Sequence, residues 1–197
     1  MCIRDSKDLD WVAACAMAHE AVVRHFARRL TTVPMRLFTL FRTDERALEH
    51  VRKSQAHLSR VLKRVDGCEE WGVRLFAADP PPAKAVSIEG PDAGRRFLER
   101  KRAQHQATRT ETTAAARKAQ AVVRGLARTA RAQRQLPIPK AAASGRLIVD
   151  AAFLVPRDGR ARFRTAVAQA AAEGRADGVR VDLTGPWPPY NFVEEAR

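Results

Sequence analysis

The chain has 197 residues, with 36 lysine and arginine residues against 22 aspartate and glutamate residues, and a formal net charge of +14 at pH 7. Its 45% hydrophobic content is that of a globular protein and excludes a wholly disordered chain. The longest apolar runs, such as residues 11–17, are far shorter than the ~20 residues that span a bilayer, so we expect no membrane span. Three scattered cysteines, Cys2, Cys15 and Cys68, indicate neither a disulfide framework nor a metal cluster and fit a reducing, cytoplasmic setting.

The first six residues, Met-Cys-Ile-Arg-Asp-Ser, resemble the translation of a sequencing-library adapter. Segments of this kind are excluded from reasoning about a fold. We therefore treat the protein as starting near Lys7 and expect a native N-terminal piece to precede it.

Helices and strands alternate in the first part of the chain. Residues 8–30 carry apolar side chains at helical spacing, and the apolar and aromatic run at residues 33–41 predicts a strand. A second helix is expected over residues 44–65, because Thr43 is a good N-cap and the apolar positions recur every three or four residues. Residues 70–77 alternate like a half-buried strand.

Composition changes after this strand. Three consecutive prolines at residues 80–82 exclude both a central strand and a helix interior. The sequence therefore predicts an N-terminal domain over residues 7–79, a linker over residues 80–91 and a C-terminal domain over residues 92–197.

Most of the positive charge lies in residues 95–134, which hold twelve basic residues against two glutamates. The abundance of alanine and arginine favours a long helix, with a bend or break expected in the β-branched stretch at residues 108–113. Such a helix could bind nucleic acid through phosphate contacts, or an acidic protein partner. It could also be no more than a solvated face, since no nucleic-acid recognition motif accompanies it.

The second part of the chain continues with a strand over residues 146–155, a short amphipathic helix over residues 159–172 and a last strand over residues 179–183. Strands interspersed with helices on one face of a sheet indicate the α+β class.

The tail is dense in rigid residues, reading Gly-Pro-Trp-Pro-Pro-Tyr-Asn-Phe over residues 185–192. Its prolines favour extended backbone, and Trp187, Tyr190 and Phe192 can bury large areas at little entropic cost. This segment could dock on its own domain, on the neighbouring domain or on a partner.

No set of residues predicts catalysis, a cofactor or a metal ion. The five histidines lie on predicted helices without zinc-ligand spacing, and the adjacent acidic pairs, Glu69 with Glu70 and Glu194 with Glu195, point in different directions. Phosphate-binding glycine loops are absent from the sequence. We therefore expect a protein that is not an enzyme.

The tail sequence resembles the terminal signature of the gas vesicle protein GvpL/GvpF family, and four weaker matches follow the family's order. Residues 33–41 resemble its Val-Pro-(Met/Leu)-Arg-Phe-Gly-Thr strand, and residues 70–73 resemble the strand after its helix. Residues 94–100 resemble its Gly-x-x-Tyr-Leu helix start, and residues 150–155 resemble the strand before its last helix. Two departures are Leu37-Phe38 in place of Phe-Gly and Phe97 in place of Tyr.

This resemblance implies two small α+β domains. The first would be ferredoxin-like and would lack its opening strand, in line with the adapter-like start, and the second would combine the long basic helix with a short sheet. It also implies an accessory protein of gas vesicle assembly in a prokaryotic cytoplasm, with a chaperone-like or nucleating role. The expected partners are the hydrophobic shell protein and other accessory proteins, and the candidate contact residues are Trp187, Tyr190, Phe192, Arg95 and Arg96. The alternative is a basic protein that binds nucleic acid through residues 95–134.

Overall fold

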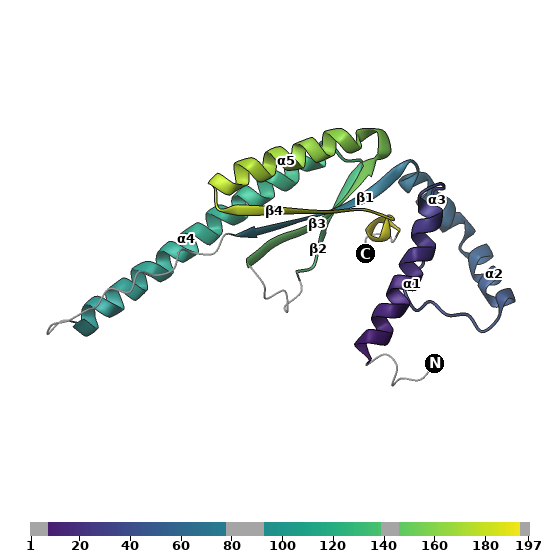
Figure 1. The fold of residues 1–197 in the computed structure, drawn as a ribbon, viewed down its shortest axis with the longest axis horizontal. Helices are drawn as coiled ribbons and strands as arrows, with labels where there is room; N and C mark the ends of the chain where they lie inside the picture. Colours follow the sequence, from purple (N-terminus) through teal and green to yellow (C-terminus); the bar gives the residue numbers. More distant parts are fainter. Residues whose placement is uncertain (1–7, 78–92, 139–145, 194–197) are drawn as a thin grey trace.

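The computed structural model describes residues 8–77, 93–138 and 146–193. The predicted linker at residues 80–91 and the adapter-like residues 1–6 lie outside these ranges. The described chain is elongated, with a sheet at its middle, helix α4 extending beyond one end of the sheet and helices α1, α2 and α3 gathered at the other (Figure 1).

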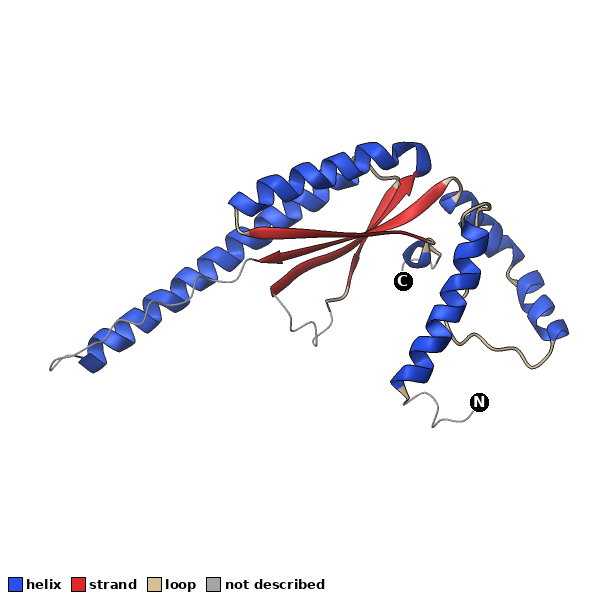
Figure 2. Cartoon of the chain, in the orientation of Figure 1, coloured by secondary structure: helices blue, strands red, loops and turns tan. Residues whose placement is uncertain are grey.

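The sheet has four antiparallel strands in the order β2-β3-β1-β4. Helix α4 connects β1 to β2, and helix α5 connects β3 to β4, so the order of elements is βαββαβ, as in a split βαβ unit. Figure 2 shows both helices on the same face of the sheet. The bounds are β1 Cys68–Ala77, α4 Ala93–Ala127, β2 Ala132–Leu136, β3 Arg146–Pro156, α5 Arg160–Ala176 and β4 Val179–Trp187.

The α+β class predicted from the sequence is confirmed by this arrangement. Strand β1 comes from the predicted N-terminal domain, whereas β2, β3 and β4 come from the predicted C-terminal domain. A single sheet therefore joins residues on both sides of the predicted linker, with β1 between β3 and β4.

Side chains alternate along β1 and β3, so each face of the sheet carries its own hydrophobic core. On one face, α4 and α5 close what we call the helix-side core, which includes Trp71, Phe153 and Phe163. On the other face, α3 and the tail close a smaller, tail-side core, whose buried members are Val61, Val65, Cys68, Ala152, Leu154 and Phe192.

Three helices precede the sheet, at Leu9–Ala27 (α1), Asp44–Lys53 (α2) and Gln55–Val65 (α3). The carboxylate of Asp8 caps α1 by accepting hydrogen bonds from the backbone N–H groups of Asp10 and Trp11, at 3.0 and 3.2 Å. The single helix predicted over residues 44–65 is instead two helices that meet at Ser54.

The prediction of a strand over residues 33–41 is wrong. These residues form an irregular loop in which Phe38 has a φ of 65° and stacks its ring on Trp11, with 5.8 Å between ring centroids. Apolar and aromatic composition favours a strand only where a neighbouring strand completes the hydrogen bonds, and the described residues pair no strand with this segment.

The basic helix also differs from its predicted form. Helix α4 runs without a break through residues 108–113, where the hydroxyl of Thr110 donates a hydrogen bond to the carbonyl of Gln106 within the helix. It ends at Ala127 instead of residue 134, and residues 132–136 form edge strand β2. The sequence Ala-Gln-Arg-Gln-Leu has no strand signal of its own, so pairing with β3 overrides its helical preference.

Phe163 should be a main determinant of stability. Its side chain is fully buried, with ring centroids 5.4 Å from Phe153 and 6.2 Å from Trp71. We expect Phe163→Ala to lower the free energy of unfolding by about 3–5 kcal/mol in urea titrations. The control is Phe26→Ala, since Phe26 is 51% exposed. An equal loss in both variants would contradict the assignment of the helix-side core.

Candidate functional site

The tail, residues 185–193, is held against the sheet by the carboxylate of Glu70 on β1. Oε2 of Glu70 accepts a hydrogen bond from the backbone N–H of Asn191 at 2.8 Å, and Oε1 accepts one from the side-chain amide of Asn191 at 2.6 Å. Glu70 is only 4% exposed. A carboxylate this deeply buried requires such donors, so β1 and the tail depend on each other.

The environment of Glu70 shifts the pKa of its carboxyl group. Burial raises the pKa of the Glu70 carboxyl, while the hydrogen bonds from Asn191 and the charge of Arg134 act in the opposite direction. Burial is the largest cause, so the net direction is upward.

Tyr190 connects the tail to α1. Its hydroxyl donates a hydrogen bond to Oε2 of Glu20 at 2.6 Å. Burial raises the pKa of the Tyr190 phenol, and this hydrogen bond raises it further, so the phenol stays protonated as the donor. Next to it, Phe192 is buried in the tail-side core, and its carbonyl accepts a hydrogen bond from the Arg64 guanidinium at 2.7 Å.

Trp187 is the most open of the three predicted aromatic contact residues, with 38% of its surface exposed. The guanidinium of Arg24 lies 5.3 Å from its ring centroid, a favourable cation–π distance. Gly185 lets the chain pass close to β1: it has a φ of 118°, and a Cβ there would lie 2.9 Å from the carbonyl oxygen of Glu70.

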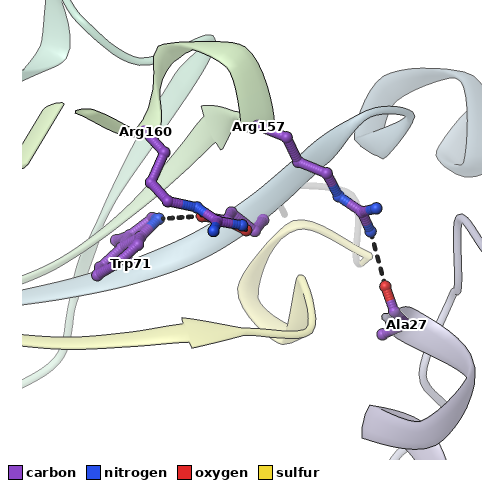
Figure 3. Close-up of polar contacts among 5 residues, drawn as sticks. Ala27, Trp71, Arg157 and Arg160 are labelled. Carbon is purple, nitrogen blue, oxygen red and sulfur yellow. Dashed lines mark hydrogen bonds and ion pairs between the residues drawn. The ribbon is translucent and has the colours of Figure 1, made fainter. Parts of the chain in front are cut away.

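A cleft of about 430 Å³ lies where the tail, α1 and the start of β1 meet; we call it the tail cleft. Residues of the short helix η2 (Arg157–Gly159) and the start of α5 complete its wall. Figure 3 shows Arg157 reaching toward the end of α1, where its guanidinium donates a hydrogen bond to the carbonyl of Ala27 at 2.7 Å. The lining residues used below are Arg24, Arg28, Glu69, Arg157, Arg160 and Trp187.

The carboxylate of Glu69, in the cleft lining, accepts three hydrogen bonds from neighbouring side chains. Glu69 accepts two hydrogen bonds from the Arg160 guanidinium, at 2.7 and 2.6 Å, and a third from the indole N–H of Trp71 at 2.9 Å. The ion pair raises the pKa of the Arg160 guanidinium. Because adjacent strand residues face opposite sides, Glu69 binds α5 while Glu70 binds the tail, so the two carboxylates diverge as the sequence predicted.

The two arginines predicted on the basic helix lie elsewhere. Arg95 is exposed near the start of α4 and forms an i,i+4 ion pair with Glu99 at 3.0 Å. Arg96 belongs to the same helix, but its side chain lies outside the described part of the chain. The structure thus groups Trp187, Tyr190 and Phe192 in one tail and does not bring Arg95 to them.

Sequence reasoning missed the residues that hold the tail, chiefly Glu20, Arg64 and Asn191. These contacts join residues more than 100 positions apart, and no local pattern signals them. A usable signal was present in β1, where two adjacent carboxylates stand in a mainly apolar strand and, once buried, require hydrogen-bond partners.

Two further properties concern the described residues. They contain no group of three or more histidine, cysteine, aspartate or glutamate side chains arranged to hold a metal ion. None of the helices in these ranges combines the length and hydropathy that a bilayer crossing requires.

The described residues therefore combine a four-stranded α+β fold with an aromatic tail beside a cleft lined by arginines. The sequence model of the gas vesicle synthesis protein GvpL/GvpF family matches residues 4–194, and the chain belongs to this family. It is 31% identical to gas vesicle protein L of Streptomyces sp. (strain CB03234), over 95% of this chain and 71% of that protein. It is 27% identical to gas vesicle protein L2 of Halobacterium salinarum, over 98% of this chain and 75% of that protein.

Solved structures show the same fold. The crystal structure of the gas vesicle protein GvpF from Anabaena sp. PCC7120 aligns with a TM-score of 0.63 at 17% identity, covering 92% of this chain and 75% of that one. The GvpF structure from Microcystis aeruginosa aligns with a TM-score of 0.60 at 15% identity, covering 91% and 76%. The family membership predicted from the tail signature is confirmed.

Removing the Glu70 carboxylate should release the tail. In Glu70→Leu the two donors of Asn191 lose their acceptor, and we expect the free energy of unfolding to fall by about 2–3 kcal/mol. Hydrogen exchange in the tail should accelerate. Glu173→Leu, at an exposed position of α5, is the matched control. Unchanged tail exchange in Glu70→Leu would show that other contacts suffice to hold it.

Because the pKa of Glu70 is raised, the free energy of unfolding should depend on pH, and the direction of this dependence follows from the shift. The folded state binds this proton more tightly than the unfolded chain, where the pKa is about 4.3. Protonated Glu70 therefore adds to the free energy of unfolding below the unfolded-state pKa. This contribution is lost as the pH rises through the raised pKa of the folded state.

Glu70→Gln cannot titrate and removes this contribution. Urea titrations between about pH 4 and pH 7 should show wild type losing stability relative to Glu70→Gln as the pH rises. A constant difference between the two proteins across this range would contradict the shift.

Proposed function

We propose that this protein is an accessory factor of gas vesicle assembly that binds the hydrophobic shell protein and other accessory proteins, in a chaperone-like or nucleating role and without catalysis. The observation that carries the proposal is its membership of the GvpL/GvpF family along nearly the whole chain. Family membership also supports association with gas vesicles in the cytoplasm.

The surface chemistry of the α1–α2 region supports a hydrophobic partner. Large apolar side chains stay exposed on α1, on the loop that follows it and on α2: Met17, Val22, Phe26, Leu30, Leu40 and Leu48 are each more than half exposed. Exposed apolar side chains gathered in one region are typical of protein-interaction surfaces. A shell subunit that builds an extended apolar sheet would aggregate before assembly, and a surface of this kind could cover it.

Sheet edges offer a second mode of contact. Strands β2 and β4 are the outer strands of the described sheet, and an outer strand can pair with an added strand of a partner. We include these edges with the tail in the proposed partner surface.

The division into two α+β domains, with a ferredoxin-like first domain over residues 7–79, stays a prediction; among the described residues of this stretch the one strand, β1, pairs in the same sheet as β2, β3 and β4. Support for the division comes from the sequence resemblance.

Nucleic-acid binding through residues 95–134 stays a prediction. Its support is the charge of α4, where Arg95, Lys101 and Arg102 are exposed. The membership of a gas vesicle family favours protein partners over nucleic acid.

Trp187 provides the test of the tail as a contact surface. We expect Trp187→Ala to lower the recovery of shell protein in a pull-down by several-fold, because an aromatic side chain at an interface contributes roughly 2 kcal/mol or more. The control is Leu98→Ala, which removes an exposed apolar side chain of α4 that lies outside both the cleft lining and the α1–α2 surface. Thermal unfolding of both variants confirms that they fold. Equal recovery with wild type and Trp187→Ala would remove the tail from the interface.

A further inference from the structure

Arginines outnumber carboxylates in the lining of the tail cleft. Four arginines line it, and two of them have carboxylate partners: Arg160 pairs with Glu69 at 2.6 Å, and Arg24 pairs with Glu20 at 3.1 Å. The other two are Arg28 and Arg157.

Neither of these two guanidiniums forms an ion pair within the described part of the chain. Arg157 donates to the carbonyl of Ala27, a neutral acceptor at the end of α1. Arg28 follows α1 as its C-cap, and its exposed side chain makes no hydrogen bond or ion pair with the described residues. In the cleft lining four arginines stand against one carboxylate, Glu69, which already binds Arg160 and Trp71; Asp66 and Asp158 act on the lining residue Cys68 but are not part of the lining.

One part of the cleft wall is apolar and rigid. It consists of Trp187 with Pro186, Pro188 and Pro189 from the tail, and Leu30 and Val65 lie nearby in the lining. The wall is fixed in place by the bonds of Asn191 to Glu70 and of Tyr190 to Glu20, so a ligand would not have to order it.

From this pairing of surplus guanidinium groups with an aromatic and proline wall, we propose that the tail cleft binds an extended segment of a partner protein that carries a carboxylate next to an apolar side chain. The carboxylate would lie at Arg28 and Arg157, and the apolar side chain would lie on Trp187. A volume of about 430 Å³ accommodates a few residues of such a segment and exceeds what a single small anion fills. This inference rests on the proposed function and specifies the chemistry of the partner segment.

The test uses a fluorescein-labelled, acetylated and amidated peptide of alternating leucine and glutamate, titrated with the full chain and followed by anisotropy. A peptide of alternating leucine and glutamine has the same shape without the charge. Wild type should bind the glutamate peptide, with weakening at higher salt, and should bind the glutamine peptide at least about ten-fold more weakly.

Arg28→Glu should weaken binding of the glutamate peptide at least about ten-fold, because it replaces a charge-assisted contact with a repulsion. The matched control is Arg29→Glu, one position along and outside the cleft lining, where binding should change less than about two-fold. Both substitutions place the same charge at the end of α1, so they share any effect on that helix. Arg28→Leu, which removes the charge without reversing it, should give an intermediate loss.

Three results would overturn the inference: equal binding of the two peptides by wild type, equal losses in Arg28→Glu and Arg29→Glu, or full displacement of the peptide by millimolar inorganic phosphate, which would indicate a simple anion site. The shell-protein pull-down separates this inference from the proposed function. If shell protein is recovered with Arg28→Glu as with wild type and the glutamate peptide fails to bind, the assembly role stands and the carboxylate site falls. If the peptide binds as expected and no gas vesicle protein is recovered, the assembly role falls.

Discussion

The buried carboxylate of Glu70 is the interaction on which the arrangement of the tail depends. An ionised group placed under a sheet destabilises the fold unless donors reach it, and here both donors come from Asn191, 121 positions later in the chain. The neighbouring carboxylate, Glu69, faces the other side and binds Arg160 at the start of α5. Two adjacent residues of β1 therefore fix the layers on both faces of the sheet, and the tail cleft forms where these attachments meet α1.

Elements with a strong local pattern could be predicted from the sequence. The strands at Cys68–Ala77 and Arg146–Pro156 and the helix at Arg160–Ala176 are apolar at the period of their structure, and each is buried accordingly. Prediction failed where pairing with a neighbouring strand decides the secondary structure. Residues 33–41 have strand composition without a strand partner in the described chain, and residues 132–136 have helical composition beside the open edge of β3. In both segments pairing, rather than propensity, determines the structure.

The candidate site was predictable in kind but not in detail. The proline and aromatic composition of residues 185–192 indicates a segment that docks, because little entropy is lost when stiff backbone and large rings are fixed. Composition does not say where it docks, since Glu20, Arg64 and Glu70 are distant in sequence. The three aromatic residues have different surroundings: Phe192 packs in the tail-side core, Tyr190 bonds to α1, and Trp187 lines the cleft with 38% of its surface exposed and the Arg24 guanidinium over its ring.

The anchoring of the tail matters for the recognition of a partner. A tail anchored by Phe192, Tyr190 and Asn191 presents Trp187 and its prolines as a surface that is already ordered, so a partner gains contact area without the cost of fixing a loop. The same anchoring holds these residues in the cleft that Arg28 and Arg157 also line. A net charge of +14 would attract acidic partners over a distance, but it is screened within about 10 Å in salt and does not select among them. Under the proposal, selection comes from short-range contacts with the Arg28 and Arg157 guanidinium groups and with the apolar residues of the same lining.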